Sequence, residues 1–392
     1  MKSIYMDHAA TTPVDPRVLE AMLPTLTQVY GNASSVHHIG QEARKLVEEA
    51  REKVATALNA KPGEIYFTAG GTEADNLAVL GVAEALKEKK GRHVITTGIE
   101  HHAIFDSFLW LKENGYEVTE VPVDEYGRVN PLDVEKAIRS DTILVSIMHA
   151  NNEIGTIQPI AEIGAITRAK GVYFHVDAVQ TVGHIPVDVQ SMNIDLLSLA
   201  AHKFYGPKGV GALFLRRGVR IKQHLHGGAQ ERGLRPGTEN VPGIVGMGKA
   251  IEIAIATMRE EAEKERALRD KLIAGLLQIS DVRLNGHPTE RLPGNVNVSI
   301  SYIEGESILL SLDLQGICAS SGSACTSGSL EPSHVLLNIG LDHPTAHGSL
   351  RLTLGRQNTM DEVDYVLNVL PEIVQRLRQM SPIWPANLIQ EK

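Results

Sequence analysis

The stretch DLLSLAAHKFYGPKGVGALFL, residues 195–215, holds two short apolar runs on either side of one lysine and a Gly-Pro turn. Runs of this length, bounded by turn residues, are typical of buried strands. Lys203 follows the first run, DLLSL (195–199), and precedes the second, GALFL (211–215). Because the end of a buried strand is an unfavourable place for a solvated amine, the pattern indicates a function for Lys203.

Further runs of the same kind lie upstream and alternate with helical patterns such as EADNLAVLGVAEALKEKK and PIAEIGAITRAKG. The additional predicted strands are EIYFT (64–68), HVITT (93–97), TILVSIM (142–148) and VYFHV (172–176). This alternation predicts an α/β fold in which helices cover a mostly parallel sheet.

The pattern changes from about residue 245. A long charged helical pattern, AIEIAIATMREEAEKERALRDKLIAGLLQ, precedes the segments NVNVSISYI (295–303) and SLRLTL (349–354), which alternate at period two. Such alternation is typical of a half-exposed sheet. We therefore expect a large α/β domain at 13–250 and a smaller α+β domain at 251–392, which also includes residues 1–12 and carries a cysteine loop at 318–332.

Composition excludes several classes of protein. The 392 residues include only two cysteines, which show neither a disulfide framework nor metal-ligand spacing. A net charge of −9 argues against a nucleic-acid surface. The N-terminus lacks a signal-peptide pattern, and no apolar run approaches the length needed to cross a bilayer. We expect a cytoplasmic protein that binds neither nucleic acid nor membranes.

In open α/β sheets, ligands bind at the carboxyl ends of the strands. The first predicted strand is followed by AGGTEADN (69–76), where backbone N–H groups around Gly71 and Thr72 would cradle a phosphate at a helix N-terminus. An ordinary turn with Thr72 as the helix N-cap is the alternative. The chain has neither G-x-G-x-x-G after a strand nor a P-loop, so a dinucleotide is not expected.

The next strands are also followed by polar residues. His101 and His102 come after HVITT, and because adjacent side chains point different ways, we expect one at a ligand and one on the surface rather than a metal pair. Asn151 and Asn152 come after TILVSIM as turn formers or ligand donors. Asp177 comes after VYFHV, where a helix cap and a ligand contact are equally plausible.

Asp177 and Lys203 end neighbouring predicted strands, one crossover apart. Pyridoxal 5′-phosphate (PLP) needs such a pair, because an amine holds its aldehyde carbon and a carboxylate faces its pyridine nitrogen. Together with the phosphate cradle and a histidine able to stack on the ring, the pair predicts a PLP site.

The segment SSGSACTSGS (320–329) sets Cys325 among small hydroxylic and glycine residues. Free cysteine is usually a buried, hydrophobic residue, whereas this composition predicts an exposed and pliable loop. Cys318 follows LDLQGI at the end of an apolar, strand-like run, and we expect it in the core.

Six segments together resemble the cysteine desulfurases, in the group with a long Ser/Gly-rich cysteine loop that acts in iron–sulfur cluster assembly. They are YMDHAATTPVDPRV, MHANNEIGT, HVDAVQTVG, SLAAHKFYGPKGVGALF, GGAQERGLRPGTEN and SSGSACTSGSLEPSHV, and they span nearly the whole chain in order. The resemblance implies a fold-type I, PLP-dependent homodimer that converts L-cysteine to L-alanine. It also implies a protein that accepts the sulfur, either an iron–sulfur scaffold protein or an acceptor in the biosynthesis of another thio-cofactor.

The resemblance implies a role for each matching residue. Lys203 would hold PLP covalently, Asp177 would face the pyridine nitrogen, and His101 would stack on the ring and move protons. Cys325 would take the sulfur as a persulfide, with no resident metal beyond a transient metal or cluster contact at this thiol. The remaining implied contacts are Asn152 and Gln180 at the ring hydroxyl, Thr72 and His202 at the phosphate, Thr238 at the phosphate of the other subunit, and Asn32 with Arg351 at the substrate carboxylate.

Some alternatives stay open. Asn32 also fits a turn residue, and Arg351 also fits a helix-terminal arginine. Another fold-type I enzyme, such as an aminotransferase or a selenocysteine lyase, would use the same lysine and aspartate, but an aminotransferase would have no task for Cys325. A non-catalytic scaffold is disfavoured because the reactive residues are intact.

The chain departs from the family pattern just before the lysine. Many relatives carry a small hydroxyl residue there that reaches the phosphate, where this chain has Ala200 and Ala201. One hydrogen bond to a charged group contributes about 1.5–3 kcal/mol, so we expect looser PLP retention.

Overall fold

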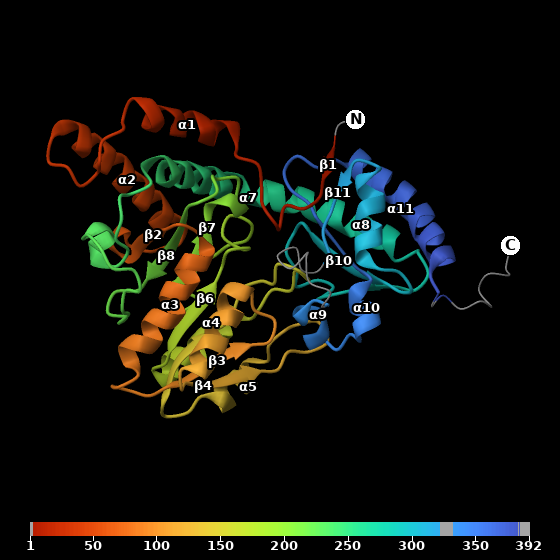
Figure 1. The fold of residues 1–392 in the computed structure, drawn as a ribbon, viewed down its shortest axis with the longest axis horizontal. Coiled ribbons are helices and arrows are strands. Elements are labelled where there is room, and N and C mark those ends of the chain that lie inside the picture. Colours follow the sequence, from red (N-terminus) through yellow and green to blue (C-terminus); the bar gives the residue numbers. More distant parts are fainter. Residues whose placement is uncertain (1–2, 322–331, 383, 385–392) are drawn as a thin grey trace.

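A computed structural model describes residues 3–321, 332–382 and 384 of the chain. Cys325 and most of the predicted cysteine loop lie outside the described residues. The larger part of the structure is built on a seven-stranded sheet of order β2-β8-β7-β6-β5-β3-β4 (Figure 1). Its strands are β2 (Ile65–Thr68), β3 (His93–Thr97), β4 (Glu117–Val121), β5 (Thr142–Ser146), β6 (Tyr173–Asp177), β7 (Leu196–Ala200) and β8 (Gly211–Leu215).

The sheet is mostly parallel, which confirms the predicted fold class. Only β8 is antiparallel to its neighbours, β2 and β7, while the pairs from β7 to β4 are all parallel. Strand β4 was not predicted from the sequence. Its residues, EVTEV, carry two glutamates and lie largely open at the edge of the sheet, so the strand lacks the apolar run typical of its buried neighbours.

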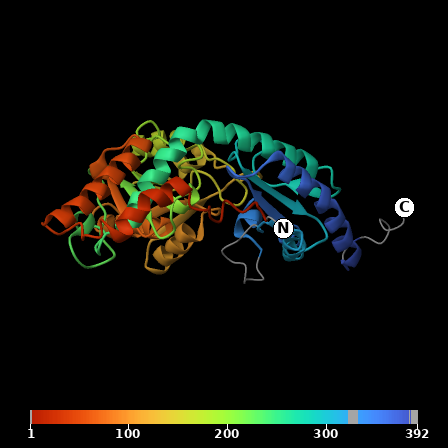
Figure 2. The ribbon, with the colours of Figure 1, turned by 90° about the horizontal axis from the view of Figure 1, so that it is seen from above.

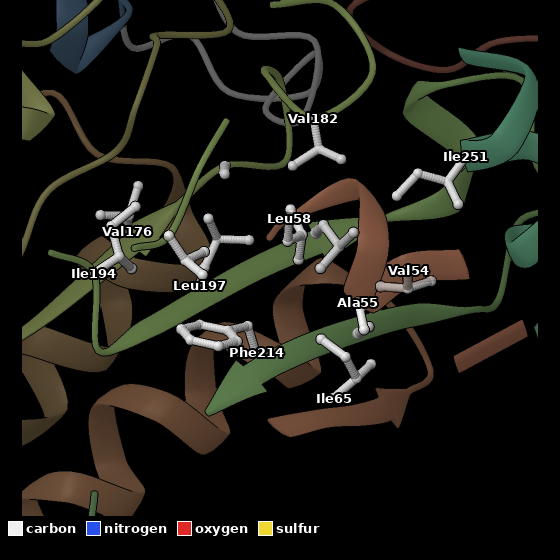
Figure 3. Packing of buried hydrophobic residues seen from close by; sticks show 14 of the residues in the cluster. Val54, Ala55, Leu58, Ile65, Val176, Val182, Ile194, Leu197, Phe214 and Ile251 are labelled. Carbon is white, nitrogen blue, oxygen red and sulfur yellow. The ribbon is translucent and has the colours of Figure 1, made fainter. Parts of the chain in front are cut away.

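Helices cover both faces of this sheet. One face carries α3 (Gly71–Leu86) and α4 (His102–Glu113). The other carries α2 (His38–Ala57), α6 (Ile160–Lys170) and the first half of α7 (Val241–Leu276). Figure 3 shows the second face, where Leu58, directly after α2, and Ile251 of α7 pack with Leu197 and Phe214 of the sheet. Because side chains alternate between the two faces along each strand, the sheet has a buried surface on both sides.

A smaller part of the structure follows. It contains the antiparallel sheet β12-β10-β9 and the parallel pair β1-β11. Its strands are β1 (Ile4–Tyr5), β9 (Val282–Leu284), β10 (Asn295–Ile300), β11 (Ile317–Cys318) and β12 (Ser349–Thr353). Helices α8 (Gly305–Asp313) and α11 (Met360–Met380) cover it, with a separate core that includes Val298, Leu352 and Leu370. Cys318 is half-buried on β11, so its predicted place in the core is wrong.

Helix α7 contacts α1 (Pro16–Thr27) and α2 in the larger part and β10 and α11 in the smaller part, and it runs along both in Figure 2. The predicted domain boundary at residue 250 stays a prediction.

One stretch of 18 residues in α7 has a mean hydropathy of 1.4 and is long and apolar enough to cross a membrane. The expectation that no apolar run approaches this length is therefore wrong, although 56% of the stretch is buried, as in a core helix.

Candidate active site

A cavity of about 350 Å³ opens at the carboxyl ends of the parallel strands. Its walls come from the segments that follow β2, β3, β5, β6 and β7, the place where open α/β sheets bind ligands. The lining includes the predicted site residues Gly71, Thr72, His101, Asn152, Asp177, Gln180, His202, Lys203 and Arg351. Residues spread over most of the sequence therefore meet at one edge of the sheet.

Lys203 lies in the short 3₁₀ helix η2 (Ala201–Lys203), directly after β7. Its Nζ donates hydrogen bonds to the carbonyl oxygens of Ala9, at 2.5 Å, and Ala10, at 2.8 Å. Gln180 Nε2 donates to the same Ala9 oxygen at 3.0 Å. The N-terminal segment thus lies against the lysine and forms one wall of the cavity, a contact that no local pattern predicts.

Asp177 is the last residue of β6 and is 6% exposed. Its Oδ1 accepts a hydrogen bond from the Val179 N–H at 2.9 Å. Burial raises the pKa of Asp177 to about 6, while the Val179 N–H and the charge of Lys203 oppose this shift. At neutral pH the carboxylate is ionised, as required of a group that faces a protonated pyridine nitrogen.

His101 is the N-cap of α4, where its Nδ1 accepts a hydrogen bond from the Ala103 N–H at 3.1 Å. Burial, followed by the charges of Lys203 and His102, lowers the pKa of His101 to about 4. The ring is therefore neutral at physiological pH and is suited to lie against an aromatic ring. His102 also lines the cavity, with its Nδ1 3.5 Å from Asp106 Oδ1, so the expectation that only one histidine of the pair would face the ligand site is wrong.

The start of α3 has the geometry of a phosphate cradle. The N-cap is Gly70, so the alternative of Thr72 as N-cap is wrong. The first residue of α3 is Gly71, where the Cβ of any other residue would lie 2.8 Å from Val179 Cγ2. The absence of a side chain keeps the space beside the helix N-terminus open for a ligand. His202 faces the same region, with its Nδ1 3.1 Å from Thr11 Oγ1. These groups fit a phosphate through backbone N–H donors and the helix dipole.

Arg351, on β12, reaches the cavity from the smaller part of the structure and is 1% exposed. Its Nη2 donates to Asp7 Oδ1 at 2.9 Å, and its Nη1 donates to the Asn152 carbonyl oxygen at 3.2 Å. Its Nε has no hydrogen-bond partner among the described residues. The helix-terminal alternative for Arg351 is wrong, because the residue lies within a strand.

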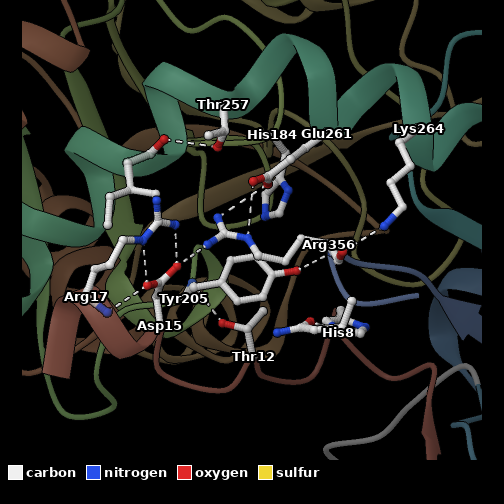
Figure 4. A network of polar contacts seen from close by, with 12 residues as sticks. His8, Thr12, Asp15, Arg17, His184, Tyr205, Thr257, Glu261, Lys264 and Arg356 are labelled. Carbon is white, nitrogen blue, oxygen red and sulfur yellow. Dashed lines mark hydrogen bonds and ion pairs between the residues drawn. The ribbon is translucent and has the colours of Figure 1, made fainter. Parts of the chain in front are cut away.

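A polar network behind Lys203 joins the two parts of the structure (Figure 4). The Arg356 guanidinium lies 3.7 Å from the centre of the Tyr205 ring and forms ion pairs with Asp15, at 2.6 Å, and Glu261, at 3.2 Å. Tyr205 is two residues from Lys203 and has a φ of 64°, a strained conformation for a tyrosine. The Arg356 contact holds the Tyr205 ring, and the Tyr205 N–H donates a hydrogen bond to Thr12 Oγ1 at 2.8 Å, which fixes the backbone after the lysine.

Four acidic or histidine residues in the lining escaped the sequence reasoning: Asp75, Glu100, Glu153 and His334. Burial raises the pKa of Glu100 to about 8 and that of Glu153 to about 7. Glu100 directly precedes His101, and Glu153 directly follows Asn152, so their positions beside strand ends were the available signal. Asp75 and His334 gave no local signal, since each reaches the cavity through helix packing.

Three predicted residues are not brought into the cavity. Asn32 is exposed, and its Oδ1 accepts a hydrogen bond from the Ser34 N–H at 2.9 Å, as in the turn alternative. Thr238 is also exposed and outside the lining. Cys325 lies outside the described residues. Ala200, the departure from the family pattern, does line the cavity, so its methyl group faces the place predicted for the phosphate.

The cavity combines a lysine, a buried carboxylate, a neutral histidine and a helix N-terminus, which is the donor set that PLP requires. The class-V aminotransferase family model matches residues 4–366. A cysteine desulfurase IscS of Methanosarcina thermophila is 59% identical over 98% of this chain and 95% of its own length. The chain belongs to the cysteine desulfurases of the class-V aminotransferase family.

Solved structures of this family agree with the fold. A NifS-like protein superimposes with a TM-score of 0.90 at 43% identity and covers 96% of this chain and 100% of its own. A structure of SspA in complex with cysteine has a TM-score of 0.81 at 36% identity and covers 91% of this chain and 100% of its own. The cysteine desulfurase described here is therefore a fold-type I enzyme with PLP as its cofactor.

Proposed function

We propose that this enzyme removes sulfur from L-cysteine, leaves L-alanine, and passes the sulfur through a persulfide on Cys325 to an acceptor in iron–sulfur cluster assembly. One observation carries the proposal: Lys203, Asp177, His101 and Arg351 converge on a single cavity at the strand ends. The relative named IscS, at 59% identity over almost the whole chain, supports the choice of cysteine desulfurase over aminotransferase.

The chain's own residues divide the work. Lys203 would hold the cofactor covalently and then carry the proton that leaves the substrate Cα. Asp177 would stabilise a positive pyridine nitrogen, and Arg351 would bind the substrate carboxylate with a guanidinium suited to two parallel hydrogen bonds. His101, neutral because of its low pKa, would lie against the ring and accept or donate a proton at the substrate. When bound, PLP supplies the electron sink for these steps.

The sulfur transfer balances without an added oxidant. The Cys325 thiolate attacks the substrate sulfur, so an S–S bond forms and the substrate Cβ–S bond breaks. The electron pair of the broken bond stays with the substrate carbon, which takes a proton and becomes the methyl group of alanine. The sulfur is oxidised to the persulfide level while this carbon is reduced. The acceptor then takes the outer sulfur from Cys325.

The test compares the two cysteines. We expect Cys325→Ala to keep the fold and the bound cofactor but to form neither alanine from L-cysteine nor a protein persulfide. Cys318→Ala is the matched control, because this half-buried thiol lies outside the cavity lining; it should keep turnover. Alanine production is measured with and without a thiol reductant, and persulfide by mass spectrometry. Wild-type turnover in Cys325→Ala would exclude this thiol as the sulfur acceptor.

The same experiment separates the rival enzymes. Supplied with an α-keto acid as amino acceptor, an aminotransferase would convert L-cysteine to its keto acid in both variants and pass the amino group to the acceptor, with no alanine formed from the cysteine carbons. A selenocysteine lyase would release selenium from L-selenocysteine in Cys325→Ala while its activity on L-cysteine stayed low in every variant.

We also propose a homodimer in which Thr238 reaches the phosphate of the partner's cofactor. The exposed position of Thr238, outside its own cavity, supports this arrangement. Mixed dimers of Lys203→Ala and Thr238→Ala chains provide the test. If Thr238 acts across the interface, one site of the mixed dimer combines the intact Lys203 of one chain with the intact Thr238 of the other. This site has wild-type PLP affinity. A defect equal to that of the Thr238→Ala homodimer, or a fully active monomer by light scattering, would contradict the proposal. The cytoplasmic location and the identity of the sulfur acceptor stay predictions.

A further inference from the structure

A buried polar cluster lies between α3 and the sheet, directly behind the cavity. Asp75, on α3, is 1% exposed, and its Oδ1 lies 3.6 Å from His175 Nε2. The two ring nitrogens of His175 lie 2.8 Å from Ser146 Oγ and 3.0 Å from Ser198 Oγ. Asp75 Oδ1 has no hydrogen-bond partner among the described residues, which is unusual for a buried carboxyl oxygen. None of these residues has a role in the chemistry described above.

The cluster adjoins the carboxylate assigned to the pyridine nitrogen. His175 and Asp177 alternate on β6 and point to the same face of the sheet, toward α3. Asp177 is in register with Ser198 on β7, and both Asp75 and Asp177 line the cavity. Two carboxyl groups therefore approach one site from opposite elements. Two ionised carboxylates in a buried site repel each other, and this repulsion favours a proton on one of them.

The surroundings decide which carboxyl is protonated. Burial, followed by the negative charge of Asp177, raises the pKa of Asp75 well above its usual range, against a hydrogen bond from Ser198. Glu100 is the other titratable acid that faces Asp75, and its ionisation would raise the pKa of Asp75 further. Burial lowers the pKa of His175 to about 3, so the ring does not take the proton from Asp75. Asp177 keeps the lower pKa of the two aspartates, because it lies near Lys203 and accepts the Val179 N–H.

We propose that Asp75 is a positioning residue that stays protonated and, with Ser198 and His175, keeps Asp177 as the only negative charge at the cofactor nitrogen. The inference rests on the proposed role of Asp177. A protonated Asp75 adds no second charge to the site, and its hydrogen bond with Ser198 links α3 to β7, where Ser198 is in register with Asp177 on β6. Ionised Asp75 would instead compete for the cationic nitrogen and repel its neighbour.

The first measurement detects the proton directly in the protein without cofactor. Asp75→Asn has nearly the same shape and is neutral at every pH. We expect the infrared spectrum of the wild type at pH 7 to contain a carboxylic-acid C=O stretch that is lost in Asp75→Asn. Glu100→Gln identifies the separate band expected for that residue. Glu73→Gln is the matched control, because Glu73 lies two residues earlier on α3, pairs with Arg235 at the surface, and should contribute no such band. A wild-type spectrum unchanged by Asp75→Asn overturns the proposal.

The second measurement follows stability with pH. A folded-state pKa above the unfolded value means that stability is present at low pH and is lost as pH rises. Asp75→Asn cannot lose a proton, so its Tm relative to the wild type should increase between pH 5 and pH 7, above the ordinary aspartate pKa of 3.8 and below the raised one, whereas the relative Tm of Glu73→Gln should not change. A purely structural role would shift the Tm equally at all pH values. A constant difference for Asp75→Asn therefore overturns the proposal.

The third measurement concerns the cofactor. Asp75→Asn should bind PLP within about threefold of the wild type, whereas Asp75→Ala, which leaves Ser198 and His175 without this partner, should bind at least about tenfold more weakly. Loss of PLP binding in Asp75→Asn would show that a negative charge at this position is required and would overturn the proposal. Asp177→Asn separates the two hypotheses. If it binds PLP normally, the role assigned to Asp177 fails, while the infrared and stability results still decide whether Asp75 carries a proton.

Discussion

Arg351→Lys tests how the enzyme binds its substrate. The guanidinium is 1% exposed and lies between Asp7 and the Asn152 carbonyl oxygen, with one edge toward the cavity. Arginine can form two parallel hydrogen bonds to a substrate carboxylate, whereas lysine presents a single point charge. The substitution keeps the positive charge next to Asp7, so it avoids the uncompensated buried carboxylate that Arg351→Ala would leave.

The structure sets the expected magnitude. Loss of one charge-assisted hydrogen bond costs about 1.5–3 kcal/mol, which corresponds to about a 10- to 150-fold decrease in kcat/KM for L-cysteine. The effect should fall mainly on KM, because the carboxylate contact is made in both the bound substrate and the transition state. The absorption band of the bound cofactor should not change, since Lys203 and Asp177 are unaltered.

The assay measures alanine formed from L-cysteine over a range of substrate concentrations. Arg356→Lys is the matched control, because Arg356 is also a largely buried arginine in an ion-pair network but lies outside the cavity lining. It should lower stability and leave KM within about threefold of the wild type. If Arg351→Lys also left KM within about threefold of the wild type, the carboxylate would be bound elsewhere and the reasoning would be refuted.

Three further results are expected. Lys203→Ala should fold but lose the absorption band of covalently bound PLP; an unchanged band would contradict the cofactor assignment. Ala200→Ser should slow PLP loss during dialysis against hydroxylamine, because the hydroxyl adds a donor near the phosphate, and unchanged retention would mean that the phosphate already has its full set of donors. Burial raises the pKa of Glu265 from its ordinary value of 4.5 to about 8, so its stabilising contribution is present below pH 4.5 and is lost as pH rises to 8. Glu265→Gln should therefore become more stable than the wild type by about 1.4 kcal/mol per pH unit across this range, measured by urea unfolding, and a pH-independent difference would refute the shift.

Much of the site was predictable because its residues follow strands. Short apolar runs and turn residues are local features, and parallel strands bring their carboxyl ends to the same edge of a sheet. The pattern therefore indicated that Asp177, His101, Asn152 and Lys203 would lie together, and all of them line the cavity. Arg351 was found by resemblance, because no local feature of SLRLTL predicts that its arginine lines a cavity. In the structure this arginine is 1% exposed.

The edge strand of the large sheet and the burial of Cys318 were less predictable. Strand β4 was missed because an edge strand with two glutamates has no continuous apolar run. Cys318 was placed in the core because it follows apolar residues, yet in the described part of the chain β11 forms a two-stranded sheet with β1, and the thiol is half-buried. Asn32 and Thr238 lie outside the cavity lining, so the roles that the resemblance implies for them stay predictions.

The sequence by itself determined the order of strands and helices, the mostly parallel sheet, and the polar residues at the strand ends, since each depends on periodicity and turn chemistry over a few residues. Only the tertiary structure decided that Ala9 and Ala10 accept hydrogen bonds from Lys203, that Asp7 pairs with Arg351, and that Asp75 and Asp177 line one cavity. These contacts join segments up to 344 residues apart. The pKa shifts of the buried carboxyls likewise follow from removal of water around them, which occurs only when the helices and sheets close on each other.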